Sequence, residues 1–168
     1  RNYKVPKRDL VNYHFYKNAK KVICQTDFHK EIACKNLDLD NIISIGGNIW
    51  SVQILEKLRQ FSKKEKKTAC SIMNSQTPHK NTNKAIQYCK SKSFEYELIS
   101  DANYINFLDK MSNNKTFVFF PGTPETLSRV VCEARMMGMA VVTNDLVGAA
   151  KESWFDKKGP QLVDLIRR

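Results

Sequence analysis

Two glutamates eight positions apart, Glu125 and Glu133, are the residues of this 168-residue chain whose type and spacing best suit chemistry. They follow a turn at 121–124 and stand in a stretch whose apolar spacing predicts one helix over 125–137. Such a turn leaves backbone N–H groups free at a helix N-terminus, where the helix dipole also favours anions. A phosphate is therefore expected against three of these N–H groups, which belong to Thr126, Leu127 and Ser128.

The spacing of the two glutamates restricts what they can do together. If both are helical, a rise of about 1.5 Å per residue separates them by about 12 Å along the axis. That separation exceeds the roughly 5–9.5 Å of a glycosidase carboxylate pair, so they are poor partners as general acid and base. It suits contacts with the two ends of an elongated ligand that carries phosphates between them. Two plainer interpretations stay open: Glu125 satisfies the helix dipole, and Glu133 faces solvent.

Lys80 adds a cation to this set. It follows a predicted strand and a six-residue polar loop, which places it at the same edge of the predicted sheet, where its ammonium could meet a diphosphate. The chain has no G-x-G-x-x-G loop after a strand, no P-loop motif and no G-x-S-x-G turn. These absences disfavour a dinucleotide site and give no support to a P-loop or a nucleophilic serine.

A regular alternation of apolar strands and amphipathic helices positions these residues. It predicts a Rossmann-like α/β domain whose parallel sheet carries helices on both faces. Strands are predicted over 21–25, 42–45, 68–73, 95–99, 116–120 and 139–143. Helices are predicted after the N-caps Thr26 and Asn48, and over 80–91, 102–111, 125–137 and 160–168. Ligands of such sheets bind beyond the carboxyl ends of the strands.

Composition fits a single domain, with 42% apolar and 27% charged residues. No apolar run approaches the ~20 residues of a membrane span, and the chain does not open like a signal peptide, so we expect a cytoplasmic protein. The five cysteines are odd in number and widely spaced, which favours reduced thiols. The three histidines lack the spacing and the cysteine partners of a zinc site, so no metal site is predicted.

The net charge of +11 is concentrated in the first half of the chain. Residues 1–84 hold 17 Lys and Arg against 7 Asp and Glu (+10), whereas residues 85–168 hold 11 against 10 (+1). A basic half can serve nucleic acid, an anionic membrane surface or phosphorylated small molecules. The densest lysine run, at 63–67, falls between a helix and a strand and is expected to be a solvated loop.

The stretch ETLSRVVCEA at 125–134, followed by MMGMAVVTN at 136–144, resembles the Glu, seven residues, Glu motif of retaining glycosyltransferases with the GT-B fold. That group includes glycogen and sucrose synthases and many bacterial mannosyl- and glucosyltransferases. Lys80 falls where the family carries its phosphate-binding lysine, and 148–152 is similar to its small Gly-x-x-x-Glu turn. The resemblance covers nearly the whole chain as the second, donor-binding domain alone.

The resemblance implies a role for each candidate residue. Glu125 would contact hydroxyls of the transferred sugar, and Lys80 would neutralise the diphosphate as it leaves. The N–H groups of 126–128 would help to hold that diphosphate, and Glu133 would bind the ribose hydroxyls. Such enzymes generally need no metal ion and no cofactor besides the nucleotide-diphosphate sugar, because cationic side chains and a helix dipole do the work of the ion.

The resemblance also implies a domain layout. Residues 1–20 would connect to a missing amino-terminal acceptor domain, 21–154 would form the nucleotide-sugar-binding domain, and 155–168 would form a closing helix. This piece alone is then expected to bind a nucleotide sugar poorly and to turn over slowly if at all. The chain departs from the family at Ser75, where an Arg of the phosphate clamp is usual. Between Ile99 and Phe117 it is also too short for the family's usual extra strand and helix, and 100–101 replaces a glycine loop, so the donor base is not assigned.

A different class of function stays open: a small basic Rossmann-like module that binds nucleic acid or another protein without catalysis. Aromatic residues do lie among the basic residues of the first 20, namely Tyr3, Tyr13, Phe15 and Tyr16. We favour the interpretation that they pack on the missing domain, so nucleic acid is the less favoured partner. An inactive sugar-binding relative is a third reading, which Ser75 keeps open. The basic charge would also suit the inner face of a membrane or a lipid-linked acceptor.

Overall fold

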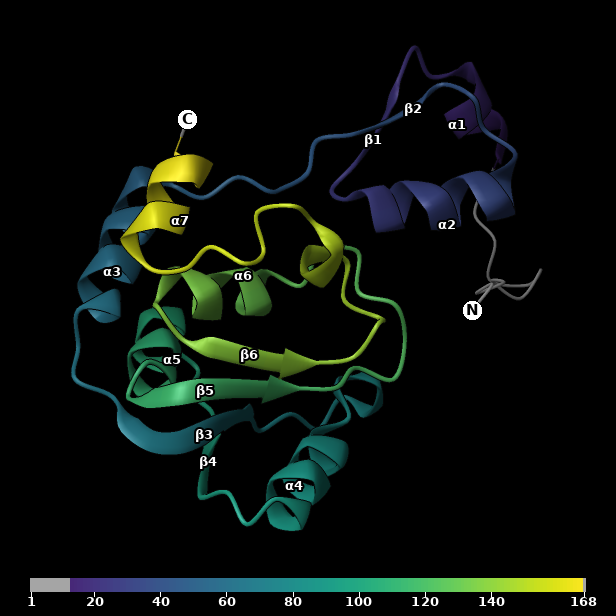
Figure 1. Cartoon of the computed structure of the whole chain (residues 1–168). Helices are drawn as coiled ribbons and strands as arrows, with labels where there is room; N and C mark the ends of the chain where they lie inside the picture. Colours follow the sequence, from purple (N-terminus) through teal and green to yellow (C-terminus); the bar gives the residue numbers. More distant parts are fainter. Residues whose placement is uncertain (1–12, 168) are drawn as a thin grey trace.

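The computed structural model describes residues 13–167 and shows strands alternating with helices, as predicted (Figure 1). The strands are β1 (Val22–Cys24), β2 (Ile42–Ser44), β3 (Lys67–Met73), β4 (Tyr96–Ile99), β5 (Asn114–Phe119) and β6 (Ala140–Thr143). The helices are α1 (Tyr13–Asn18), α2 (Asp27–Leu37), α3 (Val52–Ser62), α4 (Thr82–Ser91), α5 (Tyr104–Met111), α6 (Arg129–Met136) and α7 (Pro160–Ile166). Most of the predicted connecting segment 1–20, Tyr3 included, lies outside the described residues.

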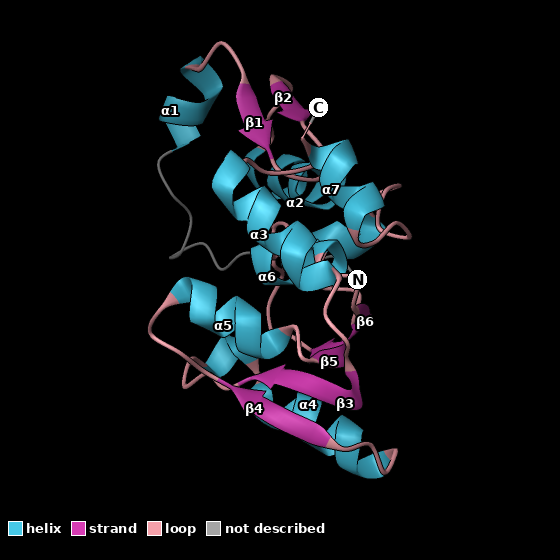
Figure 2. Cartoon of the chain, turned by 90° about the vertical axis from the view of Figure 1, so that its left-hand side faces the viewer, coloured by secondary structure: helices cyan, strands magenta, loops and turns pink. Residues whose placement is uncertain are grey.

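The larger sheet has four parallel strands in the order β4-β3-β5-β6. Helices α5 and α6 pack on one face of this sheet, α3 and α7 pack against α6 on the same side, and α4 packs on the other face, as Figure 2 shows from the side. Phe117 of β5 and Leu108 of α5 are buried in the larger core, while Ile72 of β3 and Cys89 of α4 belong to the smaller one. This is the predicted parallel α/β architecture with helices on both faces.

Strands β1 and β2 do not join that sheet but form a separate two-stranded parallel pair, with Val22 beside Ile42. Helix α2 connects them and packs against them, and Cys24, Leu39 and Ile42 form their small core. The six predicted strands therefore form two sheets and not one. A short β-α-β unit of this kind satisfies its own pairing locally, so the alternation in sequence did not reveal which sheet it belongs to.

Local signals placed some helix ends well and others badly. Thr26 caps α2 by accepting a hydrogen bond from the His29 N–H, and Pro160 occupies the first turn of α7, both as predicted. The predicted N-cap Asn48 is wrong, because Ser51 accepts from the Ile54 N–H and α3 begins after it. The predicted helix over 125–137 is also too long, since α6 begins only at Arg129.

The lysine run is not the solvated loop that the sequence predicted. The Lys64 ammonium donates to Asp109, Ser112 and Asn113, and the Lys66 ammonium donates to the carbonyl oxygens of Phe61 and Ser112. These carbonyls lie at the C-terminal ends of α3 and α5, where the helix dipole favours a cation. Two lysines of the run thus tie the two helix ends together, which leaves less of it free for nucleic acid.

Two further sequence-based expectations can be compared with the structure. All five cysteines are free, and four of them, Cys24, Cys70, Cys89 and Cys132, are buried, as expected for reduced core thiols. Among residues 13–167, no helix combines the length and the apolar character needed to cross a membrane.

Candidate functional site

The candidate site lies at the carboxyl ends of β3, β5 and β6. The chain at 125–128 is not helical here, and Glu125 forms a parallel bridge with Val147: the Glu125 N–H donates to the Leu146 carbonyl at 2.8 Å, and the Gly148 N–H donates back to the Glu125 carbonyl at 3.0 Å. The Ala149 N–H continues this pairing with the Leu127 carbonyl at 3.1 Å. Glu125 is therefore held by a neighbouring loop, and the 12 Å helical separation from Glu133 does not apply.

The structure brings two of the predicted site residues, Lys80 and Glu125, together as an ion pair. The Lys80 ammonium lies 2.7 Å from Glu125 Oε1, and both side chains are largely buried. Lys80 ends a short 3-10 helix, Pro78–Lys80, and its ammonium also lies 5.7 Å from the centre of the Phe119 ring. The Gly122 N–H donates to the His79 carbonyl at 2.8 Å, so the loop after β5 fixes the turn that carries the lysine. This ion pair joins loops 45 residues apart in sequence.

The N-terminus of α6 lies directly after this bridged segment. Ser128 is its N-cap and adopts a left-handed backbone with φ 67°, and its buried hydroxyl has no hydrogen-bond partner among the described residues. The N–H groups of Thr126, Leu127 and Ser128 likewise have no hydrogen-bond acceptor within residues 13–167. An anion with several oxygen atoms could satisfy these donors, in line with the sequence-based expectation of a phosphate.

Glu133 is 2% exposed, so the reading of a solvent-facing residue is wrong. Its Oε1 accepts hydrogen bonds from Trp50 Nε1 at 3.0 Å and from the Tyr104 hydroxyl at 2.5 Å, and Arg129 Nε lies 3.5 Å away. Burial raises the pKa of Glu133, although the hydrogen bonds from Tyr104 and Trp50 and the charge of Arg129 act in the opposite direction. Partial burial of the Tyr104 phenol, together with the Glu133 carboxylate, raises the pKa of that phenol.

Sequence reasoning missed the partners of Glu133. Arg129 could have been found, because it lies one helical turn before Glu133 and an i,i+4 pair is visible in a sequence. Its guanidinium also lies over the Trp50 ring, 5.4 Å from the centroid. Trp50 lies just before α3, and Tyr104 is the first residue of α5. Both are distant from Glu133 in sequence, so no local pattern indicates these contacts. Together the three side chains turn Glu133 into the centre of a buried polar cluster.

A hollow of about 380 Å³ opens beside this cluster at the ends of β3 and β4. Its lining includes Met73, Ser75, Asp101, Tyr104 and Phe107. Ser75 stands where the resembled family has an Arg; here its hydroxyl accepts from the Thr77 N–H, and its own N–H donates to Thr82. Ser75 thus fixes the loop between β3 and Lys80 and supplies no positive charge to a phosphate.

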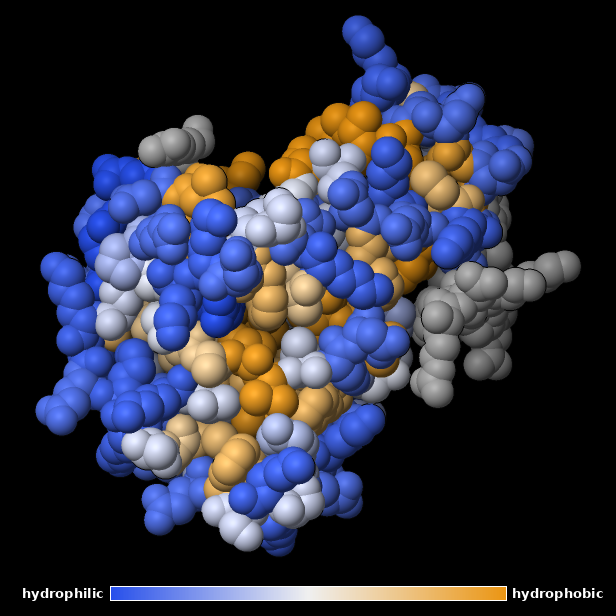
Figure 3. Space-filling view, viewed as in Figure 1, coloured by the Kyte–Doolittle hydropathy of each residue, from blue (hydrophilic) through white to orange (hydrophobic). Residues whose placement is uncertain are grey.

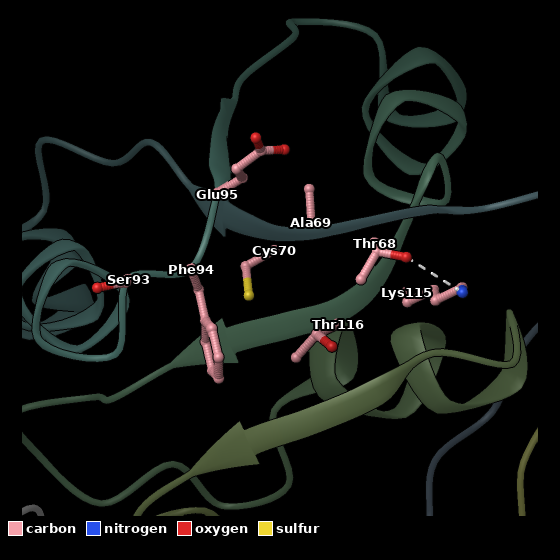
Figure 4. A pocket seen from close by; sticks show the side chains of 8 residues that line it. All are labelled: Thr68, Ala69, Cys70, Ser93, Phe94, Glu95, Lys115 and Thr116. Atoms are coloured by element: carbon pink, nitrogen blue, oxygen red, sulfur yellow. Dashed lines mark hydrogen bonds between the residues drawn. The ribbon is translucent and has the colours of Figure 1, made fainter.

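Another cavity, of about 390 Å³, lies at the opposite edge of the sheet. Figure 4 shows its walls: Thr68 and Cys70 from β3, Lys115 and Thr116 from β5, and Phe94 before β4. These residues stand at the amino ends of the strands, and none of the candidate site residues lines this cavity. Because ligands of parallel α/β sheets bind beyond the carboxyl ends, we place the functional site elsewhere. No group of three or more potential metal ligands occurs among the described residues.

Comparison with known proteins bears on the fold. No protein-family model matches the sequence, and the search of curated proteins finds no similar protein. A crystal structure of a glycosyltransferase from Rickettsia africae ESF-5 is similar over 98% of this chain and 56% of its own, with a TM-score of 0.51 and 14% identity. A crystal structure of HepE from Anabaena, in complex with UDP and glucose, is similar over 79% of this chain and 46% of its own, with a TM-score of 0.54 and 15% identity. The chain therefore spans about half the length of these proteins and has the Rossmann-like α/β fold that they share.

Proposed function

We propose that this chain is the donor-binding domain of a retaining glycosyltransferase of the GT-B fold, which transfers a sugar from a nucleotide-diphosphate sugar to an acceptor. The observation that carries the proposal is the Lys80–Glu125 ion pair, which stands at the carboxyl edge of the sheet, next in sequence to the unpaired N–H groups of 126–128. A cation, an acidic group and a set of free N–H groups are what a sugar diphosphate requires.

The ion pair suggests how the ligand would enter. In the absence of a ligand, Lys80 and Glu125 neutralise each other at 2.7 Å. A diphosphate would take over the Lys80 ammonium, which releases the Glu125 carboxylate to accept hydrogen bonds from hydroxyls of the sugar. As the bond to the sugar breaks, Lys80 and the N–H groups of 126–128 would stabilise the charge that develops on the departing diphosphate. These groups supply positive potential without a metal ion, so we propose metal-independent transfer.

Glu133 would bind the ribose hydroxyls from within its buried cluster. Trp50, Tyr104 and Arg129 all contact Oε1, so Oε2 is the oxygen that we assign to the ribose. Because the cluster holds the carboxylate in place before the ligand arrives, little ordering of the side chain would be needed on binding.

We further propose that a second domain completes the enzyme by packing on β1 and β2. The outer face of this strand pair exposes the neighbouring isoleucines Ile23, Ile43 and Ile45. Figure 3 shows apolar side chains gathered along β2 and the chain that follows it, at the upper right. Parallel sheets are normally covered on both faces, so this surface suits a further α/β domain that carries the acceptor site. The 168 residues alone would then turn over slowly if at all.

The acceptor and the cellular location belong to the same proposal. A lipid-linked acceptor would bring the protein to the inner face of a membrane as a cytoplasmic, peripheral enzyme, and the net charge of +11 would favour anionic lipid there. The competing class, a nucleic-acid-binding module, gains no specific support from the structure, because Lys64 and Lys66 of the densest basic run are engaged in internal hydrogen bonds.

A thermal-shift titration tests the proposal with UDP, GDP, ADP, CMP, their common sugars and a short single-stranded oligonucleotide at two salt concentrations. A ligand that binds only the folded state raises the free energy of unfolding by mass action, by about 2.7 kcal/mol at a hundredfold excess over Kd, and so raises the Tm. We expect one nucleoside diphosphate to stabilise the protein and Lys80→Ala to lose this response. Lys90→Ala, an exposed lysine of α4, is the matched control. A response to the oligonucleotide alone, abolished at high salt, would refute the proposal.

A further inference from the structure

Thr26 has a fully buried hydroxyl that the proposed function does not use. It is 0% exposed and stands between β1 and α2, far in sequence from every candidate site residue. Its Oγ1 accepts a hydrogen bond from the His29 N–H at 3.1 Å, which caps α2. The same hydroxyl donates to the carbonyl oxygen of Thr126 at 2.5 Å, a residue of the candidate site. One side chain therefore links the β1-α2-β2 unit to the segment that follows Glu125.

Neighbouring contacts reinforce this link. The Thr126 hydroxyl donates to Gln25 Oε1 at 2.6 Å, and the Asp27 N–H donates to Glu152 Oε1 at 3.1 Å. Gly148 packs tightly against Thr26 and Thr126 and leaves no room for a side chain. A Cβ added to Gly148 would lie 2.6 Å from Thr26 Oγ1 and 2.9 Å from the Thr126 carbonyl carbon. The Thr126 peptide group is thus held by hydrogen bonds on one side and by the Gly148 backbone on another.

The hydrogen bond from the Thr26 hydroxyl to the Thr126 carbonyl also fixes the direction of the next N–H group. The Thr126 carbonyl and the Leu127 N–H belong to one planar, trans peptide group, so they point in opposite directions and rotate together. Since the carbonyl points to Thr26, the Leu127 N–H points away from it. That N–H has no acceptor among the described residues and is one of the donors assigned above to the diphosphate.

We infer that Thr26 is a positioning residue, whose hydroxyl fixes the Thr126 peptide so that the Leu127 N–H is presented to the diphosphate of the ligand. This inference rests on the proposed function. It means that the β1-α2-β2 unit takes part in the site without touching the ligand.

The test compares Thr26→Val, which keeps the branched shape and loses the hydroxyl, with Thr26→Ser, which keeps the hydroxyl. UDP affinity is measured by isothermal titration calorimetry. We expect Thr26→Val to weaken UDP binding about tenfold or more, the effect of about one hydrogen bond to a charged group. Thr26→Ser should stay within about threefold of the unmodified protein. Ser71→Ala is the control, because it removes another buried hydroxyl, which donates to the Met111 carbonyl at 2.8 Å far from the site. It should lower stability and leave UDP affinity unchanged.

A second readout separates this inference from the proposed function. The amide signal of Leu127 in a ¹H–¹⁵N spectrum of the free protein should move in Thr26→Val and return toward its original position in Thr26→Ser. If the unmodified protein binds no nucleoside diphosphate, the proposed function fails, and the Leu127 signal alone decides whether Thr26 sets the peptide. An unmoved signal, or equal UDP affinity of Thr26→Val and the unmodified protein, overturns the inference. Should Thr26→Val not fold, Thr26→Ala removes the same hydroxyl and its hydrogen bond to the Thr126 carbonyl, and the same two readouts apply.

Discussion

Replacement of Glu133 by Ala should destabilise the protein strongly, because this carboxylate is the common acceptor of a buried cluster. The substitution leaves Trp50 Nε1 and the Tyr104 hydroxyl without their acceptor, and Arg129 without its nearest carboxylate. A buried donor left unsatisfied costs about 1–3 kcal/mol, whereas the half-exposed Arg129 can turn to solvent when its carboxylate is removed. Since the two hydrogen bonds share one carboxylate, their costs overlap, and we expect a total loss of about 2–4 kcal/mol. That is a large part of the about 5–15 kcal/mol that a domain of this size has.

Urea denaturation followed by tryptophan fluorescence measures this loss, since Trp50 itself reports on the cluster. Glu31→Ala, an exposed glutamate of α2, is the control and should change stability by less than about 0.5 kcal/mol. A double-mutant cycle with Tyr104→Phe should give a coupling energy of about 1.5–3 kcal/mol, the usual size for a hydrogen bond to a charged group. A loss below about 1 kcal/mol in Glu133→Ala, or no coupling to Tyr104, would refute the description of Glu133 as a structural centre.

Three other predictions follow from the same structure. Burial raises the pKa of Glu133 above its ordinary 4.5, so the folded protein holds this proton more tightly than the unfolded chain. The stability that the Glu133 proton contributes is therefore complete below pH 4.5 and falls as the pH rises through the raised pKa of Glu133. Glu133→Gln should flatten this dependence of the free energy of unfolding on pH, as measured by urea titrations at several pH values. An unchanged slope would contradict the raised pKa of Glu133. Burial and the nearby Lys64 lower the pKa of Lys66 to about 8, so between pH 8 and about 10.5 the unfolded chain binds more protons and stability should rise with pH. Lys66→Met should remove this rise, and a persistent rise would point to another group. Gly148→Ala should lower the Tm by several degrees and abolish UDP binding, because the new methyl group meets the backbone of Thr126. Gly47→Ala, where a Cβ meets nothing within 4 Å, should have little effect on either; similar Tm values for the two variants would show that the junction is not tightly packed.

The sequence predicted the fold class and the position of most elements, because these depend on local signals. Apolar runs of strand length, amphipathic spacing and caps such as Thr26 act within a few residues and stabilise the same element in any context. The meeting of Lys80 and Glu125 could also be anticipated. Each follows a strand of one parallel sheet, and the carboxyl ends of such strands lie at a common edge.

What the sequence did not predict depends on contacts between distant segments. The chain at 125–128 looked helical by its spacing, but hydrogen bonds between 125–127 and the loop at 146–149 hold it outside the helix. Strands β1 and β2 have the same local pattern as the other strands. Only their hydrogen-bonded pairing with each other shows that they form a sheet of their own. The burial of Glu133 arises because Trp50 and Tyr104, each distant in sequence, reach one face of α6. A carboxylate can be buried there only because those donors replace the water that it loses, and that exchange is set by the tertiary packing.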